Sequence, residues 1–221
     1  MIGFFGGTFD PIHFGHLQAA LEITEQLALS ALYFLPCHLP PHRESPQVLA
    51  VHRSHMVSLA IQTEKRFHLD QRELLHQQPS YTVDTLQSIR AEIGETMPLV
   101  FIMGMDAFSS LQKWHRWHTI FDLAHIVVAH RPYYTKQMPA WCLERLKEDV
   151  RYLHQQASGY VMVCDITPLA ISATLIRKKI AAGSSVRYLL PEVVLNCINA
   201  QGFYKKSRFE HDETRRGCKT R

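Results

Sequence analysis

The sequence predicts an α/β protein built on a doubly wound, mostly parallel sheet with a helical C-terminal part. Two observations lead to this fold class. Short apolar runs bounded by turn signals alternate along the chain with longer segments in which apolar residues recur at helical spacing. Strands that alternate with helices are typical of a parallel sheet covered on both faces. The expected strands are residues 2–5, 31–36, 66–70, 98–104, 125–130 and 160–165.

The expected helices lie between these strands and after the last of them. Behind the first strand, Leu17, Ala20 and Leu21 recur at the spacing of one helical face. Gly183 and Gly202 follow the last two helical patterns, and glycines commonly end helices in this way. After the first helix, the helical patterns cover residues 52–64, 82–93, 140–155, 173–182 and 191–200.

Composition and charge favour one domain, residues 1–204, followed by a basic and flexible tail, residues 205–221. The 221 residues are 46% hydrophobic, enough for a sizeable core, and contain no internal repeat, low-complexity linker or composition break. The tail holds seven Lys or Arg against three Asp or Glu, which equals the whole formal net charge of +4. The body is therefore formally neutral, which argues against a basic groove and a nucleic-acid partner. For the tail, a nucleic-acid or membrane-surface arm is the alternative.

Cysteine usage and hydropathy indicate a reduced, cytoplasmic protein with no membrane partner. The five cysteines are widely spaced and form no Cys-x-x-Cys pair, so we expect neither a disulfide framework nor a zinc knuckle. The chain does not open with a basic segment and an apolar run, and no stretch approaches the roughly 20 apolar residues that a spanning helix needs. The sequence leaves open whether the protein is a monomer or a homodimer.

The stretch GGTFDPIHFGH, residues 6–16, has the residues of an anion-binding turn. Gly6 and Gly7 lack side chains, so their backbone can approach a phosphate closely and adopt positive φ where a turn requires it. His13 and His16 lie three residues apart at the predicted start of a helix, where unpaired amides and the helix dipole favour an anion. A tight turn without a ligand and a two-histidine zinc site are the alternatives. Because we find no third metal ligand at a suitable spacing, we expect an anion cradle and no protein-bound metal.

Four polar clusters follow predicted strands. They are the opening stretch, PPHR at residues 40–43, GMD at 104–106 and ISATLIR at 171–177. In open parallel sheets, ligands bind beyond the carboxyl ends of the strands where the strand order reverses, so we expect these clusters on one rim of the sheet. The chain contains no G-x-x-x-x-G-K-[ST], no G-x-G-x-x-G and no G-x-S-x-G, which argues against Walker-type ATPases, dinucleotide-binding oxidoreductases and α/β-hydrolases.

The opening stretch resembles the signature of the nucleotidyltransferase superfamily with the H-x-G-H motif, here residues 13–16, which holds the phosphates of ATP or CTP. Further motifs, PPHR, RELLHQQPSYTVDTL, FIMGMDAFSSLQKWHRW, HRP and ISATLIR, occur in the order seen in bacterial nicotinate-nucleotide adenylyltransferases, the enzymes that make deamido-NAD. This resemblance covers about residues 2–204. It implies a Rossmann-like fold and an adenylyl transfer from ATP to nicotinate mononucleotide, with pyrophosphate as the second product.

For the ATP side, the resemblance implies that the opening loop and the last helix hold the phosphates. We expect His13, His16 and Arg177 to be catalytic, with Mg²⁺ bound through the ATP phosphates. Asp106 suits hydrogen bonds from ribose hydroxyls, and an N-cap for the following helix is its alternative role. The expected ATP-binding residues are Gly6, Gly7, Thr8, Phe9, Gly104, Asp106, Ser172 and Thr174.

For the mononucleotide side, the resemblance implies a helix start that receives the nicotinate carboxylate and an aromatic ring that stacks on the pyridine. We expect Ser80 to cap that helix and Trp114 to supply the ring, although Trp114 and Trp117 can instead simply pack under a loop. In the family the residue after the stacking Trp is often Tyr, whereas His115 stands here. Arg43 and Arg131 are candidate phosphate clamps. The expected residues are Arg43, Tyr81, Thr82, Thr85, Trp114, His115 and Arg131.

The reaction expected from these parts is a direct in-line attack of the mononucleotide phosphate on the α-phosphorus of ATP. A phosphate oxygen is already a competent nucleophile, so the chain need supply no covalent residue, and catalysis becomes positioning and charge stabilisation. Two alternatives remain open. One is a related adenylyl- or cytidylyltransferase with another acceptor such as phosphopantetheine, and the other is a nucleotide-sensing binding module.

Overall fold

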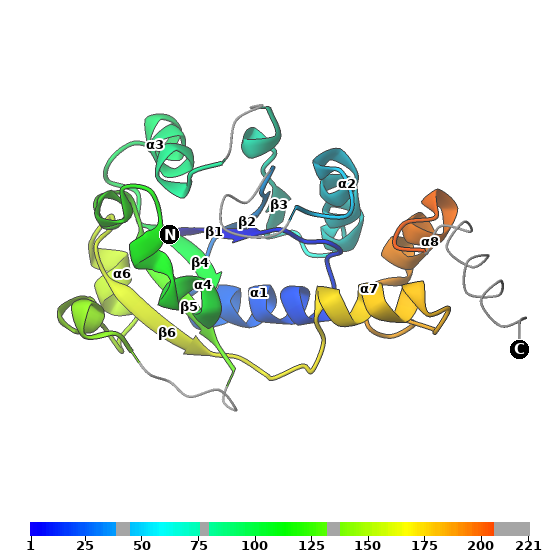
Figure 1. The fold of residues 1–221 in the computed structure, drawn as a ribbon. Coiled ribbons are helices and arrows are strands. Elements are labelled where there is room, and N and C mark those ends of the chain that lie inside the picture. The colour runs from blue at the N-terminus through cyan, green and yellow to red at the C-terminus, as the bar shows by residue number, and fades with distance from the viewer. Residues whose placement is uncertain (39–44, 76–79, 132–137, 206–221) are drawn as a thin grey trace, which may run out of the picture.

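The computed structural model describes residues 1–38, 45–75, 80–131 and 138–205, and within these ranges it contains one six-stranded sheet (Figure 1). All neighbouring strands pair in parallel, in the order β3-β2-β1-β4-β5-β6. The doubly wound, parallel α/β fold expected from the sequence is therefore confirmed. The strands are β1 (Ile2–Gly7), β2 (Ala31–Pro36), β3 (Phe67–Leu69), β4 (Leu99–Gly104), β5 (His125–His130) and β6 (Val161–Asp165).

The helices expected from the sequence are present within two or three residues of their predicted bounds, with one exception. The segment 140–155 is not one helix, because Leu146 leaves the helical path and forms a bridge with Val161, and the amide of Lys147 donates to the Val161 carbonyl at 2.9 Å. The α-helices are α1 (Phe14–Gln26), α2 (Ala50–Ile61), α3 (Thr82–Ile93), α4 (Met105–Ser109), α5 (Ile120–Leu123), α6 (Arg151–Gln155), α7 (Ala173–Ala181) and α8 (Glu192–Gln201), and the 3₁₀ helices are Arg72–Leu75, Leu111–Lys113, Trp117–Thr119 and Ala140–Arg145.

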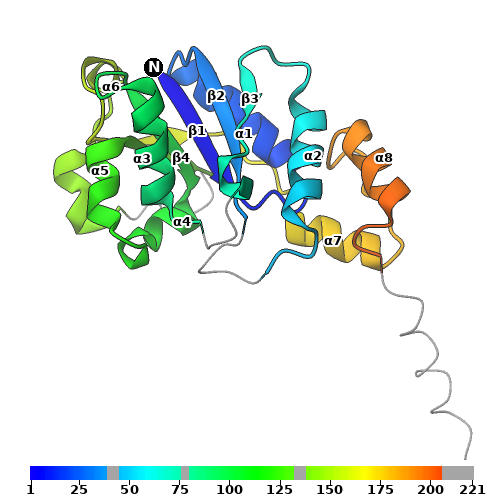
Figure 2. The ribbon, with the colours of Figure 1, turned by 90° about the horizontal axis from the view of Figure 1, so that it is seen from above.

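Alternating side chains of the strands feed two hydrophobic clusters, one on each face of the sheet. Phe5 and Val100 belong to the cluster that α1, α2, α6, α7 and α8 cover, whereas Phe4 and Phe101 belong to the cluster that α3, α4 and α5 cover. Figure 2 shows this arrangement with α3 in front of the sheet and α1 behind it. None of the helices in the described ranges is long and apolar enough to cross a membrane.

Arg53, in the first turns of α2, is fully buried and bonds to backbone carbonyls of three segments. Its Nη2 atom donates to the carbonyls of Cys37 at 2.7 Å and His38 at 3.0 Å, just beyond β2. Its Nε atom donates to Val48 at 3.1 Å, and Nη1 donates to the carbonyl of Thr8 beyond β1. The guanidinium therefore holds the two loops that leave the carboxyl ends of β1 and β2.

At the amino ends of the strands, Arg90 holds the loops that lead into the strands, as Arg53 holds loops that leave them. Its side chain, at the end of α3, is largely buried and donates only to backbone carbonyls among the described residues. Carbonyl groups in connecting segments have no partner strand, and both arginines supply the hydrogen-bond donors that a partner strand would supply. The acceptors are the carbonyls of Leu123 at 2.6 Å, Gly94 at 3.1 Å, Met97 at 2.7 Å and Ala157 at 2.7 Å.

We expect the variant Arg53→Lys to lower the free energy of unfolding by at least about 3 kcal/mol, because one ammonium cannot reach all of these carbonyls and unsatisfied buried acceptors are costly. The measurement is the urea midpoint with its slope. Arg66→Lys is the matched control, since the partly exposed Arg66 pairs with Glu64 and its substitution should leave the urea midpoint nearly unchanged. Equal effects of the two substitutions would contradict the role given to Arg53.

Candidate functional site

The candidate site lies where the strand order reverses, between the carboxyl ends of β1 and β4 (Figure 1). Residues 8–13 connect β1 to α1, and α4 begins directly after β4. The cluster at residues 40–43, including Arg43, lies outside the described residues. The clusters after β1, β4 and β6 leave the same edge, because all three strands run parallel.

His13 and His16 form a stacked pair at the start of α1. Their ring centroids lie 3.8 Å apart with an interplanar angle of 21°. His13 is 2% exposed and is the N-cap residue, although its side chain makes no capping bond. The Nδ1 atoms of both rings are buried without a hydrogen-bond partner among the described residues. Buried polar atoms are seldom left unpaired in proteins, so these atoms point to a ligand.

Both imidazoles are neutral at physiological pH. Burial and the nearby charge of Arg131 lower the pKa of His13 to about 4, and burial, His13 and Arg131 lower the pKa of His16 well below its usual range. Each ring therefore offers one N–H donor without a charge. The positive charge at this point belongs to Arg131, a half-buried residue directly after β5.

The glycines of the opening stretch allow close packing and do not supply a positive φ. A Cβ on Gly15 would lie 3.0 Å from the ring of His13, and a Cβ on Gly7 would lie 2.7 Å from the ring of Phe9. A Cβ on Gly6 would similarly lie 2.7 Å from Phe101. The positive φ of the turn, 48°, falls on Phe9. The turn therefore does not use the conformational freedom of Gly6 and Gly7, because the chain reverses at Phe9.

Asp10 connects this loop to the C-terminal helices. Its buried carboxylate accepts hydrogen bonds from the hydroxyl of Tyr204 at 2.7 Å and from the amide of Gln47 at 2.9 Å. Arg177, on α7, donates from Nη1 to the backbone carbonyl of Asp10 at 2.7 Å, and Nη1 lies 3.9 Å from the carboxylate. The structure thus brings Arg177 to the histidine loop, as the sequence predicted.

The start of α7 faces the start of α1. The carbonyl of Ile171 lies 3.5 Å from where a Cβ of Gly15 would be. Ser172 caps α7 by accepting from the amide of Leu175 at 3.2 Å, and Thr174 accepts a long bond from Arg177 at 3.4 Å. Two helix N-termini therefore meet at the candidate anion site, and both favour a negative charge there.

Gly104 and Asp106 lie at the end of β4 and are both exposed. Gly104 is the N-cap of α4, and Asp106 lies within the first turn. The alternative role of Asp106 as an N-cap is therefore wrong, because the helix begins two residues earlier than that role requires. Its carboxylate remains accessible to a ligand beyond β4.

The start of α3 contains the expected acceptor residues. Tyr81 is the N-cap and makes no side-chain capping bond, so the prediction that Ser80 caps this helix is wrong. Thr82 opens the helix, and Thr85 is buried with its hydroxyl donating to the carboxyl of Glu73 at 2.9 Å. Sequence reasoning missed Glu73, because no local spacing links it to Thr85.

The segment 114–117 approaches the start of α3. The ring of His115 lies 4.7 Å from that of Tyr81, and Arg116 lies 3.7 Å from Asp84. Trp117 packs edge-on against Trp141, so its role is structural. Trp114 is half-buried against the cluster under α3 and α5, and within the described ranges no aromatic ring stacks on it.

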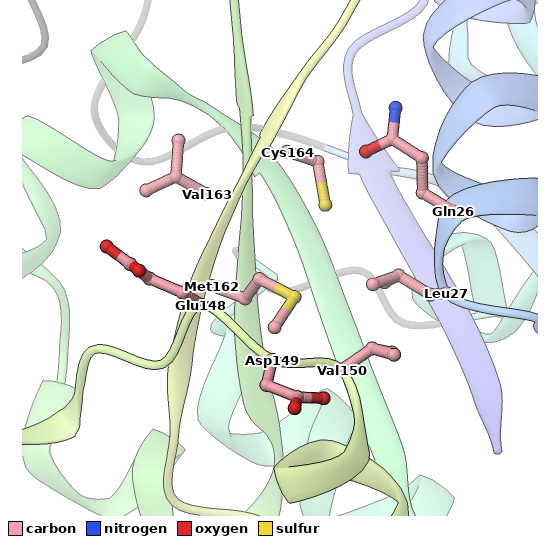
Figure 3. Close-up of a pocket in the computed structure, with 8 residues that line it drawn as sticks. All are labelled: Gln26, Leu27, Glu148, Asp149, Val150, Met162, Val163 and Cys164. Carbon is pink, nitrogen blue, oxygen red and sulfur yellow. The ribbon is translucent and has the colours of Figure 1, made fainter.

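The pocket shown in Figure 3 is separate from this site. It lies between the end of α1 and strand β6, and both polar and apolar side chains line it. Glu148 and Asp149 give it an acidic rim, which disfavours a phosphate-bearing ligand. Its remaining lining residues, none of them expected site residues, are Gln26, Leu27, Val150, Met162, Val163 and Cys164.

The described part of the chain contains no group of three His, Cys, Asp or Glu side chains that could hold a metal ion. Asp10, a buried carboxylate in the loop of residues 8–13, already accepts hydrogen bonds from Tyr204 and Gln47. A divalent ion at this site would therefore depend on oxygen ligands from a bound phosphate.

Comparisons with known proteins identify the family. The family model for cytidylyltransferase-like proteins matches residues 4–179. A probable nicotinate-nucleotide adenylyltransferase of Methylococcus capsulatus is 46% identical over 211 residues, covering 93% of this chain and 100% of that protein. Another from Pseudomonas aeruginosa is 46% identical over 208 residues, covering 92% and 97%.

Among solved structures, the Plasmodium falciparum nicotinic acid mononucleotide adenylyltransferase complexed with NaAD aligns with a TM-score of 0.68. The two chains are 17% identical, and the alignment covers 92% of this chain and 96% of that one. At this identity the likeness shows that the fold is shared.

The low pKa of His13 predicts an acid-sensitive site. Folding lowers this pKa from 6.5 to about 4, so protonation of His13 favours the unfolded chain. The folded protein therefore has its full stability with respect to His13 above about pH 6.5 and loses part of it as the pH falls toward 4. Between pH 7 and 4, we expect the wild-type protein to lose up to about 3 kcal/mol more free energy of unfolding than His13→Gln. Urea titrations at several pH values measure this, with the exposed His55→Gln as the control that should keep the wild-type slope. Parallel curves for wild type and His13→Gln would contradict the assignment.

Proposed function

The chain belongs to the family of nicotinate-nucleotide adenylyltransferases, and from this premise we propose that it joins ATP and nicotinate mononucleotide to give deamido-NAD and pyrophosphate. One observation carries the proposal beyond family membership. A stacked pair of neutral histidines with unpartnered ring nitrogens lies between two helix N-termini, beside Arg131 and close to Arg177. This arrangement suits a polyphosphate whose negative charge shifts during a reaction.

In the proposed reaction, an oxygen of the mononucleotide phosphate attacks the α-phosphorus of ATP in line, and pyrophosphate leaves from the opposite side. No residue of the chain forms a covalent bond. The protein holds the two phosphates in contact and stabilises the charge that grows on the transferred group and on the leaving group.

His13 and His16 supply N–H donors to the ATP phosphates. Because burial keeps both rings neutral, neither competes with the phosphate for protons at physiological pH. Gly15 allows the His13 ring to lie over the helix start, and the bond from Arg177 to the Asp10 carbonyl fixes the distance of that arginine from the loop. Arg177 then meets charge on the departing pyrophosphate with its remaining donors.

The other ATP contacts follow from the loops around the strand ends. The backbone of residues 6–9 and the start of α7, with Ser172 and Thr174, face the phosphates. Asp106 accepts hydrogen bonds from the ribose beyond β4, next to Gly104, where no atom would contact a Cβ and the space is open. Mg²⁺ held by the ATP phosphates would neutralise part of their charge.

The acceptor binds between α3 and the segment 114–117. Thr82 and Thr85 with the first amides of α3 receive the nicotinate carboxylate, and Trp114 stacks on the pyridine ring. Tyr81 and His115, whose rings contact each other, form the border of this pocket. Arg131 and Arg43 bind the mononucleotide phosphate. An enzyme for phosphopantetheine would have no use for the Trp114 ring or the Thr82 helix start.

We propose that residues 1–204 form one catalytic domain with a separate basic tail. ATP and the mononucleotide are metabolites of the cytoplasm, where we place the enzyme.

We expect His16→Ala to lower kcat about 10²- to 10³-fold with little change in the KM for ATP, since the donor acts on charge that develops during transfer. Initial rates of pyrophosphate release measure this effect. His55→Ala, an exposed position on α2, is the matched control and should keep wild-type kinetics. A His16→Ala enzyme within about threefold of wild type would show that His16 is not part of the chemistry.

Acceptor choice tests the proposal directly. With ATP and Mg²⁺ we expect kcat/KM for nicotinate mononucleotide to exceed that for nicotinamide mononucleotide roughly 10- to 150-fold, because only the carboxylate gains charge-assisted bonds at the start of α3. Trp114→Ala should weaken both acceptors alike, since stacking does not distinguish acid from amide. Equal values for the two mononucleotides would make the enzyme dual-specific, and turnover of phosphopantetheine alone would replace the proposed function.

A further inference from the structure

Glu73 is a buried carboxyl group that the proposed chemistry does not use. It lies in the 3₁₀ helix Arg72–Leu75, beside the start of α3, and is 7% exposed. The hydroxyl of Thr85 is 2.9 Å from Glu73 Oε1 and 3.3 Å from the carbonyl of Tyr81. Thr85 is 8% exposed, so the contact between the two side chains is almost dry.

The charges around Glu73 do not favour an ionised carboxylate. Asp70 repels it from the same segment, and Arg72 attracts it, but the Arg72 guanidinium already binds Asp70 at 2.7 Å and Glu92 at 3.0 Å. Among the described residues, the thiol of Cys37, directly after β2, also interacts electrostatically with Glu73. Burial outweighs the hydrogen bond from Thr85 and raises the pKa of Glu73 to about 7.

The protonation state of Glu73 decides what the Thr85 hydroxyl can offer, because a hydroxyl has one proton. An ionised Glu73 accepts the one hydrogen bond that the hydroxyl can donate, and Thr85 then presents only lone pairs to a ligand. A protonated Glu73 instead donates to Thr85 Oγ1, and the threonine proton is available. Without a ligand the Tyr81 carbonyl can accept it.

We propose that Glu73 is a positioning residue that, in its protonated form, turns the Thr85 hydroxyl into a donor for the carboxylate of the acceptor. The inference rests on the proposed function, in which that carboxylate lies at the start of α3. An ionised Glu73 weakens acceptor binding twice, since it withdraws the donor and places a second negative charge behind it. The effect falls on the KM for nicotinate mononucleotide and leaves the transfer step unchanged.

The test measures the KM for nicotinate mononucleotide at saturating ATP and Mg²⁺ between pH 6 and 8 for wild type and Glu73→Gln. The glutamine amide can donate to Thr85 at every pH, so it imitates the protonated acid. We expect the ratio of wild-type KM to Glu73→Gln KM to rise about tenfold from pH 6 to pH 8, as expected for a group with a pKa of about 7. Ionisation of the substrate phosphates affects both proteins and cancels in the ratio. A constant ratio would overturn the inference.

Two further comparisons keep the test decisive. Glu92→Gln removes an exposed carboxylate from the same Arg72 network and should keep the wild-type pH dependence. If Glu73→Gln does not fold, the Thr85 variants decide instead. Thr85→Ser should keep the full rise of KM with pH, whereas Thr85→Val should keep only the smaller part that comes from charge repulsion by ionised Glu73. An unchanged rise in Thr85→Val overturns the inference. If the wild-type enzyme uses nicotinate mononucleotide but the ratio of the two KM values does not change with pH, only the role of Glu73 is refuted. If this acceptor is not turned over at any pH, the proposed function is refuted as well.

Discussion

Backbone carbonyl groups from three separate segments converge on the buried guanidinium of Arg53: the loop after β1, the residues just beyond β2, and Val48, two residues before α2. Connecting segments have no ladder partners for their carbonyls, so one cation with several fixed donors satisfies them together. The loop that carries Phe9, Asp10 and His13 begins at one of these carbonyls, that of Thr8. The position of the histidine pair therefore depends on a residue that itself contacts no ligand in the proposed reaction.

Asp10 extends this framework to the other end of the chain. Its carboxylate accepts from Tyr204, 194 positions away, and its backbone carbonyl accepts from Arg177. A buried carboxylate is stable only with such partners, so the loop and the C-terminal helices stabilise each other's position. The resulting contact brings the α7 N-terminus to the α1 N-terminus, and neither helix start alone would provide the proposed phosphate site.

Desolvation acts on both ends of the proposed pocket in a consistent way. It lowers the pKa of His13 and His16 and raises that of Glu73, so each group tends toward its neutral form. A neutral imidazole and a neutral carboxylic acid are both hydrogen-bond donors, and neither carries a charge that must be buried. Charge for anionic ligands is left to arginines, which remain protonated in any environment of this kind.

The sequence by itself determined the strands, most helices and the histidine motif, because these depend on patterns within a few residues: burial on one face, glycines at turns and two histidines at a helix start. It failed for residues 140–155, where the pairing of Leu146 with Val161 interrupts the helical pattern. It also missed Asp10, Arg53 and Glu73. Their hydrogen-bond partners lie between 5 and 194 positions away, mostly in other segments. Charged residues are ordinarily solvated, so nothing in the sequence indicated that these three are buried. Only the tertiary structure decided which of them are buried, because burial and its hydrogen-bond partners arise when distant segments pack together.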